Sequence, residues 1–484
     1  MKISNKIQSK NGLNIIIVGC GKVGMTLIEQ LSKEGHDITI IDKNAAKVQE
    51  MSNLYDIMGL VGNGASYSVQ MEAGIENADL IIAVTASDEL NLLCCTVAKQ
   101  VGDCAAIARV RTPDYSKEAG YLREKLGLTM IINPEYAAAT EIARILRFPS
   151  AIKIDTFAKG RVELMKSIID QNSPLCGESL SNVAKKIKAD VLVCAVERGK
   201  DVVIPNGDFV FEENDVISIV ASPTEARDFF KQPGVETHQV KNALIVGGGT
   251  IAYYLAEQLL NMGIRVKIIE KDYKRCETLS ELLPSAMIIH GDAANQDVLF
   301  EEGIEHCEAF VSLTGIDEEN IFLSLFAQQS SKAKIITKIN RITFDEIINN
   351  FHLGSLIYPK YITSEYILQY IRAMQNSLGS NIETLYRIIE NKVEALEFHI
   401  GEDVMIPDET LENLPIKKNI LIAAINHNGK TIRPNGHSKI HAGDNVIVVT
   451  TLKGLQDIDD IFAGILEASA PCDPKGLYLQ EITY

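Results

Sequence analysis

The chain has 484 residues, of which 46% are hydrophobic and 23% are charged, and its formal net charge is −17. This length exceeds one ordinary hydrophobic core and predicts two to four domains, and the composition is typical of a soluble globular protein, not of a disordered or collagen-like one. The negative charge disfavours binding to nucleic-acid phosphates and to anionic lipid headgroups, so we expect no nucleic-acid partner.

The apolar segments are short. The longest of them, such as residues 80–85, have the length of a β-strand and fall far below the roughly 20 residues that cross a bilayer, so we expect no direct membrane insertion. Residues 1–6 lack the apolar core of a secretory signal, which predicts a cytoplasmic protein. The nine cysteines contain no C-x-x-C pair, which predicts reduced, buried thiols and neither a metal site nor a disulfide framework.

Apolar runs and helical stretches alternate through the first part of the chain. The expected strands are 13–18, 38–41, 57–60, 80–84, 105–110 and 130–132, and the expected helices begin at residues 22 and 45 and span 66–73, 89–101, 115–126 and 135–146. This alternation predicts the α/β class: a Rossmann-like, doubly wound parallel sheet with helices on both faces.

The pattern changes near residues 148–150. Residues 162–220 contain short strand-like runs, which predict a smaller α+β module. In that module, residues 198–200 are expected to form the turn of a hairpin, and the Asn206-Gly207 pair is expected to form a turn with positive φ.

The same arrangement then occurs a second time. Gly19 and Gly247 are 228 positions apart, as are Asp42 and Glu270. An offset of 229 relates Thr85 to Thr314, Asn91 to Asn320, and Arg109 to Lys338. Because this register persists over most of each half, the chain is interpreted as a tandem duplication. We expect Rossmann-like domains at 12–148 and 240–378, small modules at 149–233 and 380–466, and an unassigned tail at 467–484.

A glycine-rich turn follows the first expected strand of each half. Gly19, Gly21 and Gly24 occupy the three positions that a nucleotide-binding βα turn requires: the tight turn, the approach to phosphate, and the packing of helix on strand. In the second half these positions hold Gly247, Gly249 and the permitted Ala252. Phosphate would then lie against the N-terminus of the following helix.

An acidic residue stands at the end of the second expected strand in both halves. Asp42 and Glu270 each lie 23 residues after the first glycine, where a carboxylate accepts the hydroxyls of an adenosine ribose. Such a carboxylate repels a 2′-phosphate, so NAD(H) or an adenine nucleotide such as ATP or ADP is favoured over NADP.

The remaining candidate residues follow the other strands, since ligands of this fold bind at the carboxyl ends of the strands. The first predicted site comprises Gly19, Cys20, Gly21, Lys22, Val23, Gly24, Asp42, Gly62, Asn63, Thr85 and Arg109. The second comprises Gly247, Gly248, Gly249, Thr250, Ile251, Glu270, Asp292, Thr314 and Lys338. Arg109 and Lys338 either neutralise phosphate charge or are ordinary solvated bases. Lys22 has Thr250 as its counterpart, so the two sites need not prefer the same nucleotide.

Residues for catalysis are not evident. His36 is the only histidine of the first half, and it precedes the second strand, at the opposite end of the sheet from the expected site, so we expect an exposed turn residue. Nucleophile-elbow, zinc-protease and P-loop motifs are absent from the sequence. We therefore predict a protein that is not an enzyme, and the alternative is a soluble NAD-dependent oxidoreductase.

The ordered set of motifs resembles the RCK (KTN) domain. It consists of the glycine loop, the acid after the second strand, and the segments 62–65, 84–91 and 108–111. The small module resembles the RCK C-terminal domain. The tandem arrangement, which covers roughly residues 12–465, is similar to the cytosolic regulatory subunits of potassium uptake systems. The weaker match lies in the second half, where Ala252 and Lys338 depart from the pattern.

This resemblance implies a function. It implies a homo-oligomeric ring of RCK domains, peripheral on the inner face of the cytoplasmic membrane, that binds NAD(H), ATP or ADP. The nucleotide would rearrange the ring and so gate an integral-membrane potassium-translocating subunit. A nucleotide sensor that acts on another membrane transporter is a further alternative.

Overall fold

The computed structural model describes most of the chain. The described residues are 12–147, 151–157, 162–169, 171, 173–186, 191–199, 201–230, 239–341, 353–376, 382–389, 392–401, 409–427, 430–452, 455 and 457–463. The change of pattern at 148–150 and the tail 467–484 lie outside them. None of the helices in the described ranges combines the length and the hydropathy that a bilayer crossing needs.

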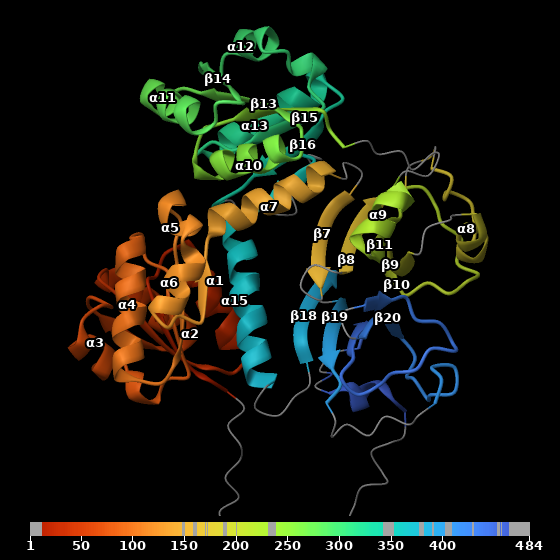
Figure 1. Ribbon diagram of the computed structural model, residues 1–484, viewed down its shortest axis with the longest axis horizontal. Helices are drawn as coiled ribbons and strands as arrows, with labels where there is room; N and C mark the ends of the chain where they lie inside the picture. Colours follow the sequence, from red (N-terminus) through yellow and green to blue (C-terminus); the bar gives the residue numbers. More distant parts are fainter. Residues whose placement is uncertain are drawn as a thin grey trace, which may run out of the picture.

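The first half begins with a parallel sheet in the order β3-β2-β1-β4-β5-β6, drawn in red and orange in Figure 1. Its elements are β1 Asn14–Val18, α1 Lys22–Lys33, β2 Asp37–Asp42, α2 Ala45–Tyr55, β3 Met58–Val61, α3 Tyr67–Glu72, the 3-10 helix η1 Ile75–Asn77, β4 Leu80–Ala83, α4 Asp88–Val101, β5 Ala105–Arg109, α5 Pro113–Lys117, α6 Ala119–Lys125, β6 Met130–Ile132 and α7 Pro134–Arg147. The central strands β1 and β4 are buried almost throughout because helices cover both faces. The predicted doubly wound sheet is confirmed.

The second half repeats this sheet in the order β14-β13-β12-β15-β16-β17. Its elements are β12 Asn242–Val246, α10 Thr250–Asn261, β13 Arg265–Glu270, α11 Tyr273–Leu282, β14 Met287–His290, α12 Gln296–Glu301, the 3-10 helix η3 Ile304–His306, β15 Ala309–Ser312, α13 Asp317–Ser330, β16 Lys334–Lys338, β17 Ser355–Ile357 and α15 Pro359–Asn376. The two sheets have the same topology, as a duplication requires.

Each small module contains an antiparallel sheet, and the two sheets match strand for strand: β10-β9-β11-β8-β7 and β21-β20-β22-β19-β18. The first comprises β7 Ala151–Phe157, β8 Val162–Ile168, α8 Leu180–Lys186, β9 Leu192–Arg198, β10 Asp201–Val203, β11 Val216–Ala221 and α9 Pro223–Phe230. The second comprises β18 Ile382–Ile389, β19 Val393–His399, β20 Ile420–His427, β21 Lys430–Ile432, β22 Asn445–Thr450 and the 3-10 helix η4 Ile458–Ile461. One apolar cluster, including Leu164, Ala195, Ala395 and Val449, joins the two modules.

Two helices are exchanged between the halves. In Figure 1, α7 leaves the first sheet and lies along α10 of the second, while α15 leaves the second sheet and lies along α1 of the first. Ile142 and Leu146 of α7 are buried in the core of the second half, and Ile367 and Ile371 of α15 are buried in the core of the first. Each half therefore completes its core with a helix from the other, a feature that the linear order of elements did not predict.

Polar contacts accompany both exchanges. The Tyr254 hydroxyl of α10 donates to the Arg111 carbonyl at 3.0 Å and accepts from Asn133 Nδ2 at 2.9 Å. At the other exchange, the Arg372 guanidinium of α15 pairs with the carboxylate of Glu34. Because these groups are partly buried and directional, they fix the register in which the apolar stripes meet.

Some local expectations were wrong. The expected helix 115–126 is broken into α5 and α6 at Glu118, where Gly120, a poor helix former, follows closely. The Asn206-Gly207 turn has no positive φ; the glycine instead permits close approach of Ser181, whose Oγ donates to the Gly207 carbonyl at 2.7 Å. His36 is buried and not exposed, since its Nδ1 accepts the Leu13 N–H at 3.2 Å.

The exchange of α15 yields a stability prediction. Ile371→Ala is expected to lower the free energy of unfolding by about 2–5 kcal/mol, because it opens a cavity in the core of the first half. Tyr366→Ala on the same helix removes a side chain that is 40% exposed. It should change the free energy of unfolding by no more than about 0.5 kcal/mol. Denaturant unfolding of both variants measures this difference. Equal effects would show that α15 does not contribute to the first core as described.

Candidate functional site

The first glycine loop lies between β1 and α1 and allows very close backbone contacts. Gly19 has φ +109°, and a Cβ at that residue would lie 3.0 Å from the Thr85 nitrogen. A Cβ at Gly24 would lie 2.0 Å from the Gly19 carbonyl oxygen. At Gly21, in contrast, a Cβ would meet no atom within 4 Å. Gly19 and Gly24 are therefore needed by the fold, whereas Gly21 borders open space.

That open space lies at the N-terminus of α1. The helix is preceded by Gly21, no side chain caps its first N–H groups, and its first turn contains no acidic residue. The neighbouring α4, in contrast, is capped by the Ser87 side chain and carries Asp88 and Glu89 in its first turn. The amides and dipole of α1 are thus available to an anion, while those of α4 are already compensated.

The acid at the end of β2 is tied to the glycine loop. Asp42 Oδ2 accepts the Cys20 N–H at 2.6 Å, and Oδ1 accepts the Asn44 N–H at 2.8 Å. Burial, and then the Asp42 charge, raise the pKa of the Cys20 thiol to about 11, so this thiol stays protonated at neutral pH. Cys20 contributes its backbone here, and its buried side chain packs in the core.

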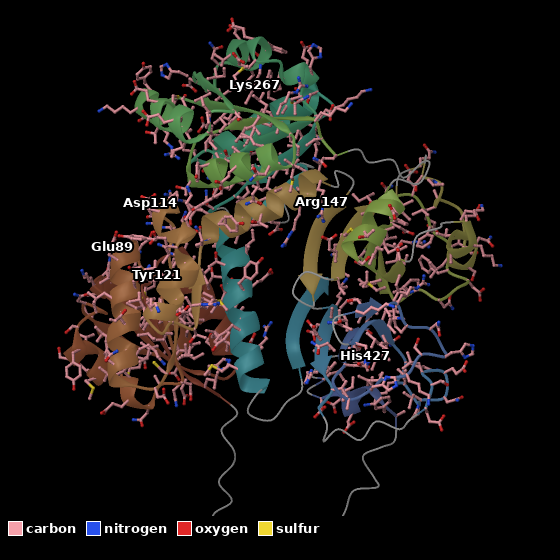
Figure 2. All side chains as sticks on the ribbon, in the orientation of Figure 1. Glu89, Asp114, Tyr121, Arg147, Lys267 and His427 are labelled. Atoms are coloured by element: carbon pink, nitrogen blue, oxygen red, sulfur yellow. The ribbon has the colours of Figure 1, made fainter. Side chains whose placement is uncertain are left out.

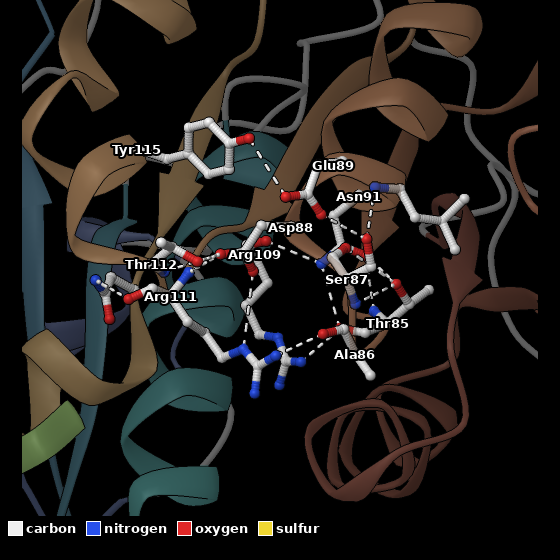
Figure 3. Close-up of polar contacts among 12 residues, drawn as sticks. Thr85, Ala86, Ser87, Asp88, Glu89, Asn91, Arg109, Arg111, Thr112 and Tyr115 are labelled. Atoms are coloured by element: carbon white, nitrogen blue, oxygen red, sulfur yellow. Dashed lines mark hydrogen bonds and ion pairs between the residues drawn. The ribbon is translucent and has the colours of Figure 1, made fainter. Parts of the chain in front are cut away.

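A hydrogen-bond network joins the ends of β4 and β5. Asn91 is fully buried; its Oδ1 accepts the Thr85 N–H and hydroxyl at 2.8 and 2.7 Å, and its Nδ2 donates to the Arg109 carbonyl at 2.9 Å. The Arg109 guanidinium donates to the Thr85 carbonyl (Figure 3). Asn91 therefore holds together two residues that the sequence predicts as ligands, a role that the sequence analysis did not assign.

Asp88 supports the same corner of the site. Its Oδ2 accepts the Arg111 N–H, the Thr112 N–H and the Thr112 hydroxyl at 2.9, 2.8 and 2.7 Å (Figure 3). Burial by itself raises the pKa of Asp88, but the hydrogen bonds from Thr112 and Arg111 outweigh burial and lower the pKa below its ordinary value. Asp317 has the same role in the second half, where it accepts the N–H groups of Asn340 and Arg341 at 2.9 and 2.6 Å.

A cavity of about 550 Å³ opens above the first glycine loop, within the size range of small-molecule sites. The predicted residues that line it are Gly19, Gly21, Lys22, Val23, Asp42, Gly62, Thr85 and Arg109. The predicted residues Cys20, Gly24 and Asn63 do not line it. Gly24 packs against the loop, and Asn63 shapes the turn after β3 by accepting the Ala65 N–H.

Residues of the second half complete this cavity. Asn340, Pro359 and Lys360 line it, together with Pro134 and Glu135 from the start of α7. Both exchanged helices therefore begin at the cavity. The sequence did not predict Asn340, Pro359 and Lys360 because it assigned them to the second half. Pro134 and Glu135 were missed although they belong to the first half. Lys43 and Lys47, which also line the cavity, were signalled only by their closeness to Asp42.

The cavity holds several positive charges at close range. Burial lowers the pKa of Lys22, and Arg341 and Lys360 of the second half lower it further. Burial likewise lowers the pKa of Arg109, whose buried Nε has no hydrogen-bond partner among the described residues. Mutual repulsion of this kind is relieved when an anion binds among the cations.

Glu135 supplies a negative charge in the same place. Burial raises the pKa of its carboxyl, although Arg109 and Arg111 act in the opposite direction. Its Oε2 is buried without a hydrogen-bond partner in the described part of the chain. Unpartnered polar atoms of both signs at one cavity indicate a polar ligand with donors as well as acceptors, a property that a nucleotide has.

The second glycine loop has the same backbone geometry but different surroundings. Glu270 Oε2 accepts the Gly248 N–H at 2.6 Å, and α10 has no side-chain cap, as in the first half. However, Arg275 Nε donates to the Gly248 carbonyl at 2.7 Å, and Lys338 is buried with its Nζ on the Leu313 carbonyl at 2.8 Å. Burial lowers the pKa of Lys338 to about 8. Lys338 is thus committed to a backbone carbonyl and not to an open anion site.

The other predicted residues of the second site form local turns. Thr314 donates its N–H to Asn320 Oδ1 at 2.8 Å, and Asp292 Oδ1 accepts the Ala294 N–H at 2.9 Å. None of the predicted second-site residues lines the 550 Å³ cavity. The cavity therefore contains residues of the first predicted site and none of the second, and the side chains around the two glycine loops differ.

Comparison with known proteins agrees with this duplicated architecture. The TrkA-N domain model matches residues 15–134 and 243–359, and the TrkA-C domain model matches residues 164–234 and 395–463. The Trk system potassium uptake protein TrkA of Halomonas elongata is 30% identical over 454 residues, which cover 93% of this chain and 98% of that protein. The chain belongs to the TrkA family.

Further relatives are consistent with this membership. The Trk system potassium uptake protein TrkA homolog 1 of Methanosarcina mazei is 29% identical over 458 residues, which cover 93% of this chain and all of that protein. A solved structure of the GsuK channel bound to NAD has a TM-score of 0.62 at 14% identity and covers 91% of this chain and 77% of that one, which shows the shared fold. Both TrkA-N matches end at the first residue of an exchanged helix, Pro134 or Pro359.

The TrkA-N glycine loop yields a prediction that separates fold from binding. Gly24→Ala is expected to lower the free energy of unfolding by about 1–3 kcal/mol, because its methyl group would overlap the Gly19 carbonyl. Gly21→Ser is the matched control, since serine is favoured before a helix and meets open space there. Thermal and denaturant unfolding report the difference. A Gly24→Ala protein as stable as the parent would contradict the described packing.

Asp88 gives a pH prediction. Its folded pKa is lowered, so its contribution to stability is present above the unfolded pKa of about 3.9 and is lost as the pH falls through the folded value. Asp88→Asn should therefore destabilise the protein by about 1–3 kcal/mol at pH 7, because buried amides lose their charged acceptor, and this difference should shrink only as the pH falls below about 4. Denaturant unfolding of both proteins at pH 7 and at acid pH, below the unfolded pKa, measures this change, and a difference that stays the same in acid would contradict the account.

Proposed function

We propose that the chain is a nucleotide-responsive regulatory subunit of a potassium uptake system. It binds NAD(H), ATP or ADP at the first glycine loop and controls an integral-membrane, potassium-translocating partner. The observation that carries this proposal is the cavity that the first glycine loop and Asp42 share with Pro359 and Lys360 of the second half. The TrkA relatives are named for potassium uptake, which supports the choice of partner.

The proposed binding mode follows from the geometry of the cavity. The phosphates bind at the N-terminus of α1 beside Lys22, and the ribose hydroxyls bind at Asp42. Lys360 at the start of α15 faces the same phosphates from the second half. A nucleotide thus contacts both halves simultaneously, and its affinity depends on how the halves are placed relative to each other.

This dependence provides the means of control. A ligand shifts an equilibrium between two arrangements only by its difference in affinity for them, and a tenfold difference supplies about 1.4 kcal/mol. Several copies in a ring, each biased in this way, add their contributions at one membrane partner. We assign the protein to the cytoplasmic side, peripheral to the membrane. The role is regulatory and not enzymatic, and none of the relatives described above is named as an oxidoreductase.

A substitution in the first glycine loop tests the proposed nucleotide-dependent control. Gly21→Asp places a carboxylate where phosphate binds, yet aspartate is a favoured residue before a helix, so the fold should remain. We expect nucleotide binding to weaken by at least about tenfold and nucleotide-dependent potassium flux to be lost. The measurement is potassium flux in proteoliposomes that contain the membrane subunit of the same host. A Gly21→Asp protein that still responds to nucleotide would contradict the proposal.

A substitution at Lys360 tests whether the second half contributes to nucleotide binding. Lys360→Gln should weaken ATP binding by about tenfold, the loss of one charge-assisted contact, and leave adenosine binding unchanged. Lys332→Gln, an exposed lysine before β16 at the opposite end of the sheet, is the control. Calorimetric titration gives both affinities. If Lys360→Gln binds ATP as tightly as the control does, the phosphates do not reach the second half.

A further inference from the structure

Each small module buries one carboxylate at the same position of its sheet. Asp215 and Asp444 have no exposed surface, and they stand just before β11 and β22. In both cases Oδ2 accepts a backbone N–H three residues earlier at 2.8 Å, from Glu212 in the first module and from His441 in the second. The turn is therefore the same in the two modules, and both must compensate a buried negative charge.

The first module balances the buried negative charge of Asp215 with a fixed positive charge. Arg198, at the end of β9, donates from Nε to Asp215 Oδ1 at 2.8 Å and from Nη2 to Asp215 Oδ2 at 2.7 Å. The third nitrogen, Nη1, donates to Glu212 Oε1 at 2.7 Å. The guanidinium keeps its charge at every accessible pH, and in this forked arrangement it ties the end of β9 to the loop before β11.

The second module has imidazoles in place of these groups. His427 stands where Arg198 does, and His441 stands where Glu212 does, each 229 residues later. Nδ1 of His427 lies 2.5 Å from Asp444 Oδ1, and Nδ1 of His441 lies 3.7 Å from Asp444 Oδ2. Figure 2 shows His427 in the blue module. Among the described residues, the Asp444 carboxylate thus meets imidazole rings and one backbone amide, and no guanidinium.

The three side chains converge on one point near the surface. Their donor atoms all lie within 4.8 Å of one another, and the two imidazole rings are half-exposed while the carboxylate is buried. Ligands placed tetrahedrally around zinc at about 2.05 Å are roughly 3.3 Å apart. The two rings approach different oxygens of one carboxylate, at 2.5 Å from Oδ1 and 3.7 Å from Oδ2, so rotations of the half-exposed rings would bring both nitrogens to ligating distance of an ion beside Asp444.

We propose that His427, His441 and Asp444 form a binding site for a divalent transition-metal ion of the zinc class. Two imidazole nitrogens and one carboxylate oxygen are ligands that such ions prefer, and the exposed side leaves a position for water. The bound ion supplies the positive charge that Arg198 supplies in the first module, and it ties the end of β20 to the loop before β22. The sequence analysis expected no metal site because it considered cysteine spacing, and this cluster contains no cysteine.

The duplication provides an exacting test variant. His427→Arg rebuilds in the second module the ion pair that the first module already contains, so it preserves the tie to Asp444 while it removes a metal ligand. The matched control is His437→Arg, which changes a histidine of the same module that is 84% exposed and contacts Glu412 at 2.9 Å. His441→Gln, which removes the imidazole and introduces neither an imidazole nor a carboxylate, is an independent second variant.

The experiment titrates the tag-free full chain with zinc chloride in a calorimeter. We expect the parent and His437→Arg to bind about one zinc ion per chain at this site, and His427→Arg and His441→Gln to bind it at least about tenfold more weakly. Zinc should also raise the thermal unfolding temperature of the parent but not that of His427→Arg. Any zinc held by thiols is common to all four proteins and cancels in the comparison.

Two outcomes would overturn the proposal. One is a parent protein that binds no zinc. The other is an affinity and a thermal shift in His427→Arg and His441→Gln equal to those of the parent, which would place the bound zinc elsewhere. Because neither measurement uses nucleotide or the membrane subunit, the result is independent of the proposed regulatory function.

Discussion

The exchange of α7 and α15 is the constraint on which the rest of the structure depends. Each helix buries its apolar stripe in the half of the chain that it did not come from, so neither half completes its core alone. Burial of large aliphatic side chains such as Ile142 and Ile371 makes this arrangement costly to undo. Because both exchanged helices begin next to the first glycine loop, the same contacts that hold the halves together also bring charges of the second half to the cavity at that loop.

The two halves have one fold, but the side chains at corresponding positions make different contacts. At the first glycine loop, Lys22 and Arg109 face a cavity, whereas at the second Lys338 is buried on a carbonyl and Arg275 contacts the loop. The small modules differ in the same way, since a permanent ion pair in one is replaced by two histidines and an aspartate in the other. At the glycine loops and in the small modules, the two halves keep the same backbone arrangement. They differ in the side chains that contact the charged groups.

Much of this could be predicted from the sequence because its signals are local. Alternating strands and helices, the glycine spacing and the acid after β2 each depend on a few consecutive residues, and the predicted sheets and family were confirmed. Two local details, the unbroken helix 115–126 and the positive φ at Asn206-Gly207, were wrong. The other failures depend on contacts between distant residues. The burial of His36 comes from a bond to Leu13, and the role of Asn91 comes from the approach of β5 to β4. The contribution of Lys360 to the cavity arises from the helix exchange, which leaves no local signal; the site residues themselves remain predictions.

The central claim is that one nucleotide is held jointly by both halves of the chain. The most direct test is an experimental structure of the full chain with ATP bound. The account predicts phosphate oxygens at the N-terminus of α1 and beside Lys22, with the Lys360 ammonium within hydrogen-bonding distance of the same phosphates. A nucleotide held entirely by the first half, with α15 out of reach of its phosphates, would contradict it.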